Sequence, residues 1–246
     1  MSSESHPSNR SGQVWHPDYG QFVNYELHDL PDDADGQVEQ TISLMRGYVN
    51  ADKLAPAVGR QVLASQMAGG DPVECVFNHV HAAMRFRNDD EIHGRIFGGW
   101  KPGGMGDVIE IISRPVDTAV AIERGFIPEE DCDGFSTYAA ALLAAQGIPC
   151  AFVTVGADAE EPWRYSHVYV VAYPVTGKYA GRRVALDTSH GGHCGWECPN
   201  RYGKLREWSL SGDANWMSLA LAGLVGYAAL QLWRGRSMLM ECVECL

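Results

Sequence analysis

Residues 131–149 constrain the fold most, because they carry the pattern of one well-defined helix. Gly147 is suited to the position just past a helix end, and Pro149 prevents the helix from continuing. The apolar side chains before them recur at helical spacing: Phe135, Tyr138, Ala139, Leu142 and Leu143. The pattern predicts a buried helix over 133–146, with Cys132 at its first turn.

This placement gives Cys132 a chemical meaning. The N-terminus of a helix carries partial positive charge and unpaired N–H groups. Such a setting lowers the pKa of a thiol and turns it into a nucleophile. We therefore expect Cys132 to ionise readily, although a single cysteine on an apolar helix is more often an ordinary core residue.

Three later segments, 151–155, 166–172 and 183–187, have the composition of strands. If the last two form a hairpin centred on Gly177, His167 and Asp187 face each other with Cβ atoms about 5 Å apart. A slip of one residue would place them on opposite faces of the sheet. With Cys132, they would form a triad of nucleophile (Cys132), general base and acid (His167) and orienting carboxylate (Asp187).

The net charge of −12 argues against binding to a phosphate backbone, so we expect no nucleic-acid partner. The N-terminal segment 1–38 is polar, rich in Pro, Gly and Asp, and strongly acidic, which predicts an irregular arm. The seven cysteines show no regular disulfide spacing, which indicates free thiols in a reducing compartment. No signal-peptide pattern opens the chain, so we expect a cytoplasmic or virion location.

Helical patterns precede the predicted catalytic helix. One covers 39–68, and a second opens at Asp71-Pro72, where the aspartate caps the helix and the proline takes its first position. The glycine-rich stretch 88–107 predicts a loop, and Pro115 opens a short helix.

The C-terminal segment differs in kind from the rest. Residues 216–233 carry no charge and are bracketed by Trp216 and Trp233. They are long enough for a tilted span of a hydrocarbon core of about 30 Å. We expect an apolar helix over 214–236 that serves as a membrane anchor; a buried core helix is the open alternative.

A group of potential metal ligands follows the predicted triad. It consists of His190, His193, Cys194 and Cys198, and four such ligands can hold zinc. Their spacing matches no common zinc motif. We therefore predict no metal and no cofactor, with zinc at these residues as the alternative.

Several motifs, in this order, resemble the transglutaminase-like core of the papain-like cysteine enzymes over roughly 105–200. They are Asp131-Cys132-Asp133-x-Phe135-Ser136, Ala140-Ala-Leu-Leu-x-Ala-x-Gly147-Ile-Pro149, Phe152-Val-Thr-Val-Gly156, Ser166-His167-Val-Tyr169 and Leu186-Asp187-Thr188. The resemblance implies an α+β fold in which N-terminal helices and the catalytic helix pack on an antiparallel sheet. It assigns 39–210 to this domain.

The chain is more narrowly similar to phage- and prophage-encoded members, through Gly195-Trp196-Glu197 and Arg206-Glu-Trp208. It departs from them at Glu130, where members often have Gly, and at Gly134, where they often have Asp. The family fold implies an oxyanion hole made by the Cys132 backbone N–H and an upstream donor, for which Trp100 is the candidate.

The resemblance implies a thiol-dependent amide or peptide hydrolase, or an acyltransferase, acting on a peptide or protein amide. Members of this family also include inactive binding modules. The alternative is therefore a non-enzymatic structural or binding module of a virus particle, with virion proteins as partners.

Overall fold

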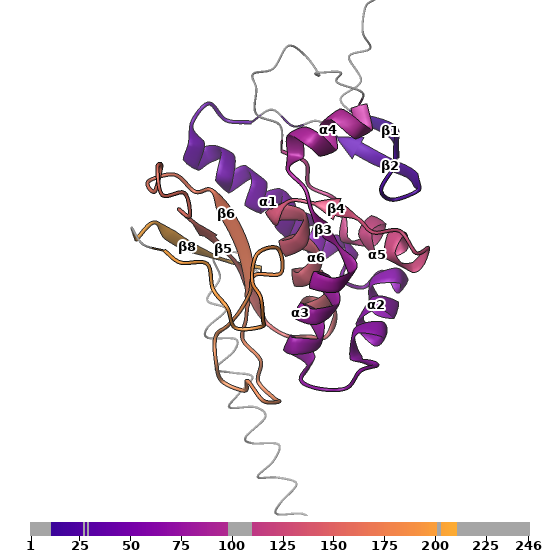
Figure 1. Cartoon of the computed structure of the whole chain (residues 1–246), viewed down its shortest axis with the longest axis vertical. Coiled ribbons are helices and arrows are strands. Elements are labelled where there is room, and N and C mark those ends of the chain that lie inside the picture. The colour runs from indigo at the N-terminus through magenta and orange to yellow at the C-terminus, as the bar shows by residue number, and fades with distance from the viewer. Residues whose placement is uncertain (1–10, 27, 29, 98–109, 201–202, 211–246) are drawn as a thin grey trace, which may run out of the picture.

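The computed structural model describes residues 11–26, 28, 30–97, 110–200 and 203–210. It is a mixed α+β structure, as predicted, with one main sheet and helices gathered against it (Figure 1). The helices are α1 (Ala34–Asp52), α2 (Pro56–Gln66), α3 (Pro72–Ala83), α4 (Asp89–Phe97), α5 (Pro115–Glu123) and α6 (Cys132–Ala145).

The main sheet is antiparallel and has four strands in the order β7-β6-β5-β8. The three predicted strands are present. The fourth, β8, was not predicted, because charged Arg206 and Glu207 interrupt its apolar pattern; such residues suit a strand at a sheet edge. The strands are β5 (Cys150–Val155), β6 (His167–Ala172), β7 (Val184–Leu186) and β8 (Leu205–Ser209).

Helix α6 lies at the centre of the core and contacts the sheet and helices α1, α2, α3 and α5. It is buried from Asp133 to Leu143, and three consecutive alanines, 139–141, let neighbouring elements approach closely. The Asp131 side chain caps it by accepting the Asp133 N–H at 2.9 Å. Gly147 follows it with a φ of 69°, a left-handed conformation that favours glycine. The predicted helix and its end are confirmed.

The helices before α6 follow the sequence pattern with one difference. The predicted stretch 39–68 is two helices, α1 and α2, because Pro56 cannot donate the backbone hydrogen bond that a continuous helix needs. The start of α3 is as predicted, since Asp71 accepts the Val73 N–H at 2.9 Å.

The prediction of an irregular N-terminal arm is wrong for residues 11–26. They form a hairpin of β1 (Ser11–His16) and β2 (Gln21–Glu26), followed by α1 from Ala34. Tyr19, in the hairpin turn, is fully buried, and its hydroxyl donates to the Glu130 carboxylate. The contact between Tyr19 and Glu130 fixes the hairpin against the rest of the fold. The polar composition of residues 1–38 did not indicate this contact.

The predicted loop 88–107 is also corrected in part, because residues 89–97 form α4. Two short strands pair in parallel beside it, β3 (Arg85–Phe86) and β4 (Glu129–Glu130), and bring α4 close to the start of α6. Trp100, the oxyanion candidate, lies outside the described residues.

The predicted C-terminal helix over 214–236 also lies outside the described residues. Within the part of the chain that the structure does describe, none of the helices has the length and apolar character to cross a membrane.

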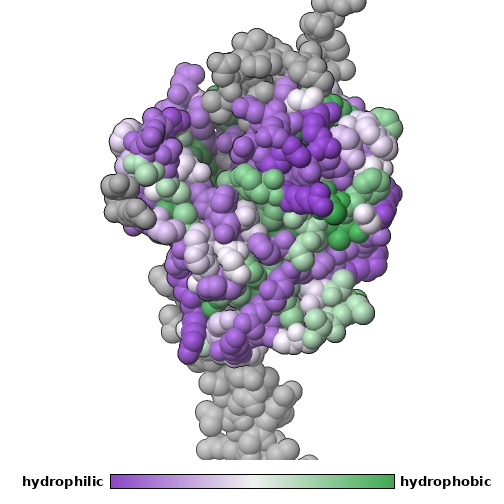
Figure 2. Space-filling model, in the orientation of Figure 1, coloured by the Kyte–Doolittle hydropathy of each residue, from purple (hydrophilic) through white to green (hydrophobic). Residues whose placement is uncertain are grey.

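On the face shown in Figure 2, hydrophilic residues dominate and hydrophobic ones are interspersed among them.

Candidate active site

Cys132 occupies the first position of α6 and is partly buried. Helix α6 forms two hydrogen bonds with the backbone of Val168, the residue after His167. The Val168 N–H forms a hydrogen bond with the Cys132 sulfur, and Ser136, one turn later, donates its hydroxyl to the Val168 carbonyl at 3.1 Å. These contacts fix the start of β6, and therefore His167, next to the tip of the helix.

His167 and Asp187 are in direct contact. The His167 Nε2 lies 2.7 Å from Asp187 Oδ2, in a position where neither side chain is exposed beyond 8%. Asp187 also accepts the Ser189 hydroxyl at 3.1 Å and the His190 N–H at 3.0 Å through Oδ1. Burial alone would raise the pKa of Asp187, but the hydrogen bond and charge of His167 hold it below its ordinary value. With Nε2 engaged, Nδ1 is the ring nitrogen left for proton transfer.

The predicted contact between His167 and Asp187 is present, although the predicted register is wrong. The observed partners, Val170 with Leu186 and Ala172 with Val184, differ from the predicted register by two residues. Because side chains alternate with a period of two, an even shift keeps both groups on the same face. The two side chains meet diagonally across the strands.

Cys132 and His167 line the same cavity, which has a volume of about 230 Å³. Its walls come from the start of α6, the segment leading into β6 and the first turns of α1, including Gln37 and Thr41. The structure thus brings the three predicted site residues into one region. The thiol of Cys132 and the imidazole of His167 line the same cavity, and the Asp187 carboxylate forms a hydrogen bond with the imidazole.

The expectation of a readily ionised thiol is wrong. Burial raises the pKa of Cys132 well above its ordinary value, and the charges of Asp131 and Asp133 raise it further. The hydrogen bond from Val168 acts in the opposite direction but does not offset them. The partial positive charge of the helix tip is thus outweighed by desolvation and by the two acids that flank the cysteine.

Four acids surround this helix tip. Burial raises the pKa of Asp131 to about 7 and that of Asp89 to about 10, and it also raises that of Asp133, whereas Glu110 is exposed. The sequence gave no indication of Asp89 and Glu110, which come together with Asp131 only through the tertiary fold.

Glu130 and Gly134 are the positions at which the chain departs from the sequence pattern that it resembles. They lie next to each other in the structure. A Cβ at position 134 would lie 2.4 Å from Glu130 Oε2, so the glutamate side chain fills the space that a side chain at 134 would need. Glu130 is fully buried, and burial raises its pKa to about 8. Glutamate at one position therefore requires glycine at the other.

The four residues of the zinc alternative do not gather. No group of potential ligands within the described residues contains more than one of them. Cys198 instead lies with His167 and Asp187, their ligand atoms all within 4.8 Å of one another. Such a set could hold a transition metal, but Asp187 already accepts hydrogen bonds from His167, Ser189 and His190.

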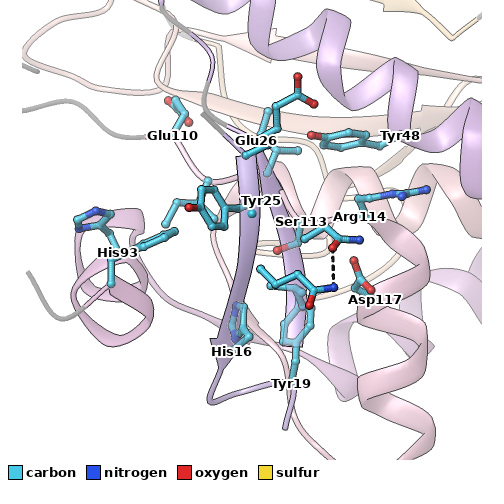
Figure 3. A pocket seen from close by; sticks show the side chains of 18 residues that line it. His16, Tyr19, Tyr25, Glu26, Tyr48, His93, Glu110, Ser113, Arg114 and Asp117 are labelled. Atoms are coloured by element: carbon cyan, nitrogen blue, oxygen red, sulfur yellow. Dashed lines mark hydrogen bonds between the residues drawn. The ribbon is translucent and has the colours of Figure 1, made fainter. Parts of the chain in front are cut away.

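A larger cavity, of about 580 Å³, lies between the β1–β2 hairpin, α4 and residues 110–117 (Figure 3). It contains none of the predicted catalytic residues. His16 lines it, and neither of its ring nitrogens meets a hydrogen-bond partner among the described residues. Burial and the charge of Arg95 lower the pKa of His16 to about 4. Glu110 lines both this cavity and that of Cys132.

Comparisons with known proteins leave the site to be judged on its own geometry. No protein-family model and no curated protein matches the chain. A solved structure described as "Crystal structure of a TGase" matches 74% of this chain and 44% of its own, at 15% identity and a TM-score of 0.35. The chain therefore spans less than half of that structure's length, and a likeness this remote carries no argument about activity.

Proposed function

We propose that this protein is a thiol-dependent amide or peptide hydrolase, or an acyltransferase, of the transglutaminase-like type. Cys132 is its nucleophile, His167 its general base and acid, and Asp187 the carboxylate that orients the imidazole. The observation that carries the proposal is the buried 2.7 Å contact between His167 and Asp187, in a position where the imidazole shares a cavity with Cys132. Its proposed substrate is a peptide or protein amide.

The reaction would proceed through a thioester. His167 takes the thiol proton as the Cys132 sulfur attacks the carbonyl carbon, and the backbone N–H of Cys132 donates to the developing oxyanion. The imidazolium returns its proton to the amine as the carbon–nitrogen bond breaks. Water or a second amine then attacks the thioester carbon and gives a proton to His167; the carbon–sulfur bond breaks, and the imidazolium returns the proton to the Cys132 sulfur. We favour water as the acceptor.

The acids beside Cys132 determine how the thiol is activated. Because the pKa of Cys132 is raised, the thiol is protonated at neutral pH, and a preformed thiolate is not available. The proton must leave during the attack, which makes the base essential.

The test is acylation by a p-nitrophenyl ester, followed by mass spectrometry of the modified peptide. We expect the acyl group on Cys132 in the wild-type chain and none in Cys132→Ala. Cys194→Ala is the matched control, because it removes another partly buried thiol and should leave the acylation unchanged. Acylation of Cys132→Ala at the wild-type rate would contradict the assignment.

The second candidate is a non-enzymatic structural or binding module, for example of a virus particle. The raised pKa of Cys132 favours it, because an inert buried thiol has the same property. The two candidates differ in the role of His167. In an enzyme, His167→Ala lowers acylation of Cys132 by about 10²- to 10⁴-fold; in a binding module, it changes the rate little.

A further inference from the structure

A second histidine, His190, lies beside the proposed base. The centres of the His190 and His167 rings are 4.8 Å apart, and the ring planes are nearly perpendicular, at 83°. Phe86 of β3 makes a similar contact with His190, at 4.8 Å between ring centres and 65° between planes. Aromatic rings favour such edge-to-face arrangements. The His190 ring therefore has a defined position between two other rings, although the residue is exposed.

A chain of hydrogen bonds joins the His190 ring to the Asp187 carboxylate. The Ser189 hydroxyl donates to Asp187 Oδ1 at 3.1 Å, and its oxygen lies 2.9 Å from His190 Nδ1. A hydroxyl has only one hydrogen to donate, so the Ser189 oxygen must be the acceptor in its contact with His190. Nδ1 of His190 therefore carries a hydrogen, and the chain runs from imidazole to hydroxyl to carboxylate.

The charge state of His190 suits a place next to the base. Burial and the charge of His167 both lower the pKa of His190 below its ordinary value of 6.5, so this imidazole is neutral at neutral pH. A positive charge at His190 would oppose formation of the imidazolium that the proposed reaction requires at His167. The neutral ring can contact His167 without this repulsion.

The backbone after β7 holds these groups together. The His190 N–H donates to Asp187 Oδ1 at 3.0 Å, and the Gly191 N–H donates to the Asp187 carbonyl at 2.8 Å. A Cβ at position 191 would lie 2.5 Å from that carbonyl oxygen, so the turn closes only with glycine there. The His81 ring, near the end of α3, lies 3.1 Å from the Thr188 carbonyl. The segment that carries His190 is therefore fixed at several points.

We propose that His190 is a positioning residue of the candidate active site, an inference that rests on the proposed function. Its backbone N–H and, through Ser189, its Nδ1–H occupy Asp187 Oδ1, which leaves Oδ2 for His167. Its ring packs against the His167 ring and restricts rotation of that ring. Together these contacts keep the hydrogen of His167 on Nε2, so that Nδ1 stays available for proton transfer.

The first test is nitrogen NMR spectroscopy of the full chain with isotope-labelled histidines. The shifts of the two ring nitrogens report the tautomer of His167 whether or not the protein is an enzyme, and His167→Gln identifies its signals. We expect one tautomer in the wild type, with hydrogen on Nε2, and averaging of the two shifts in His190→Ala. His193→Ala is the matched control, because it removes another exposed histidine of the same segment. Unchanged His167 shifts in His190→Ala, or an equal change in His193→Ala, would overturn the proposal.

The second test is the rate at which the p-nitrophenyl ester acylates Cys132. His190→Ala should lower this rate about tenfold, because the base is less well oriented but still present. The ester concentration that gives half the maximal rate should stay unchanged. His190→Phe keeps a ring and His190→Asn keeps a hydrogen-bond donor, so each should recover part of the rate.

A double-mutant cycle separates positioning from a merely structural role. In the Asp187→Asn background, His190→Ala should have little further effect on acylation, because a positioning residue acts through the carboxylate. Additive losses in this cycle would contradict the proposal. Absence of acylation in the wild-type chain would instead remove the proposed function, and the nitrogen shifts would still decide whether His190 fixes the His167 ring.

Discussion

The sheet side and the helix side of the Cys132 cavity treat buried acids in opposite ways. On the sheet side, Asp187 is fully buried and accepts bonds from His167, Ser189 and His190, and its pKa is held below the ordinary value. On the helix side, burial and the charges of neighbouring acids raise the pKa of Asp133, whose Oδ1 accepts from the Cys132 thiol at 3.7 Å.

This difference separates a carboxylate that is stabilised as an anion from carboxyl groups whose neutral form is favoured by burial. A buried carboxylate that accepts several hydrogen bonds is stabilised as an anion, and it can then hold an imidazole in one orientation. A buried carboxyl beside other acids must hold a proton or a cation. We therefore infer that Asp187 orients the imidazole as an anion, whereas burial favours the protonated form of Asp131, Asp89 and Asp133 at the helix tip.

The strongest test of the sheet side is Asp187→Asn. The amide would donate to Nε2 and favour the wrong tautomer of His167, so we expect acylation of Cys132 to fall by about 10²- to 10⁴-fold. The rate of acyl-enzyme formation measures this, with circular dichroism to confirm that the variant is folded. A folded variant with wild-type acylation would remove Asp187 from the mechanism.

The tightest packing on the helix side is between Glu130 and Gly134. Gly134→Ala should destabilise the protein by about 1–3 kcal/mol, because the new Cβ overlaps the glutamate side chain. Urea unfolding measures the change. Combining it with Glu130→Ala should recover part of the loss, with a coupling of about 0.5–3 kcal/mol in the double-mutant cycle. Strict additivity of the two substitutions would show that the positions are independent.

The two sides should respond oppositely to pH. The folded-state pKa of Glu130 is raised to about 8 from 4.5, so the folded chain holds a proton that the unfolded chain loses. Stability should therefore fall as pH rises from 5 to 8, by up to about 1.4 kcal/mol per pH unit for one such group. Asp187, whose pKa is lowered, contributes stability that is present above pH 3.8 and is lost as pH falls through its folded-state pKa.

Glu130→Gln isolates the contribution of the raised acid. The amide oxygen can still accept from Tyr19, but the side chain no longer titrates, so the decline between pH 5 and 8 should flatten. Urea midpoints measured across this pH range give the slope of stability against pH. A slope equal to that of the wild type would assign the pH dependence to other groups.

The smallest expected effect concerns Ser189→Ala. It removes one of the hydrogen bonds to Asp187 and leaves the contact with His167 in place. We expect a loss of about 0.5–1.5 kcal/mol in the free energy of unfolding, with acylation reduced far less than in Asp187→Asn. A loss of acylation as large as that in Asp187→Asn would mean that the hydroxyl, rather than the carboxylate, orients the imidazole.

Local signals in the sequence were sufficient for much of the fold. Helix α6 was predictable because periodic apolar residues, a glycine at its end and a proline beyond it all agree. The contact between His167 and Asp187 was predictable for a weaker reason: strand periodicity fixes the face of a residue but not its register, and the observed shift happened to be even. The hairpin over 11–26 and strand β8 were missed, because long-range contacts hold them against an unfavourable local composition.

By itself, the sequence determined where α3, α5, α6 and the central strands lie and which three side chains could meet, because these follow from periodicity and end signals within short stretches of chain. Tertiary structure alone decided the electrostatics of the site. Whether a thiol ionises depends on the depth of its burial and on every charge within a few ångströms, and Asp89 and Glu110, distant in sequence from Cys132, reach its helix tip only in the folded chain.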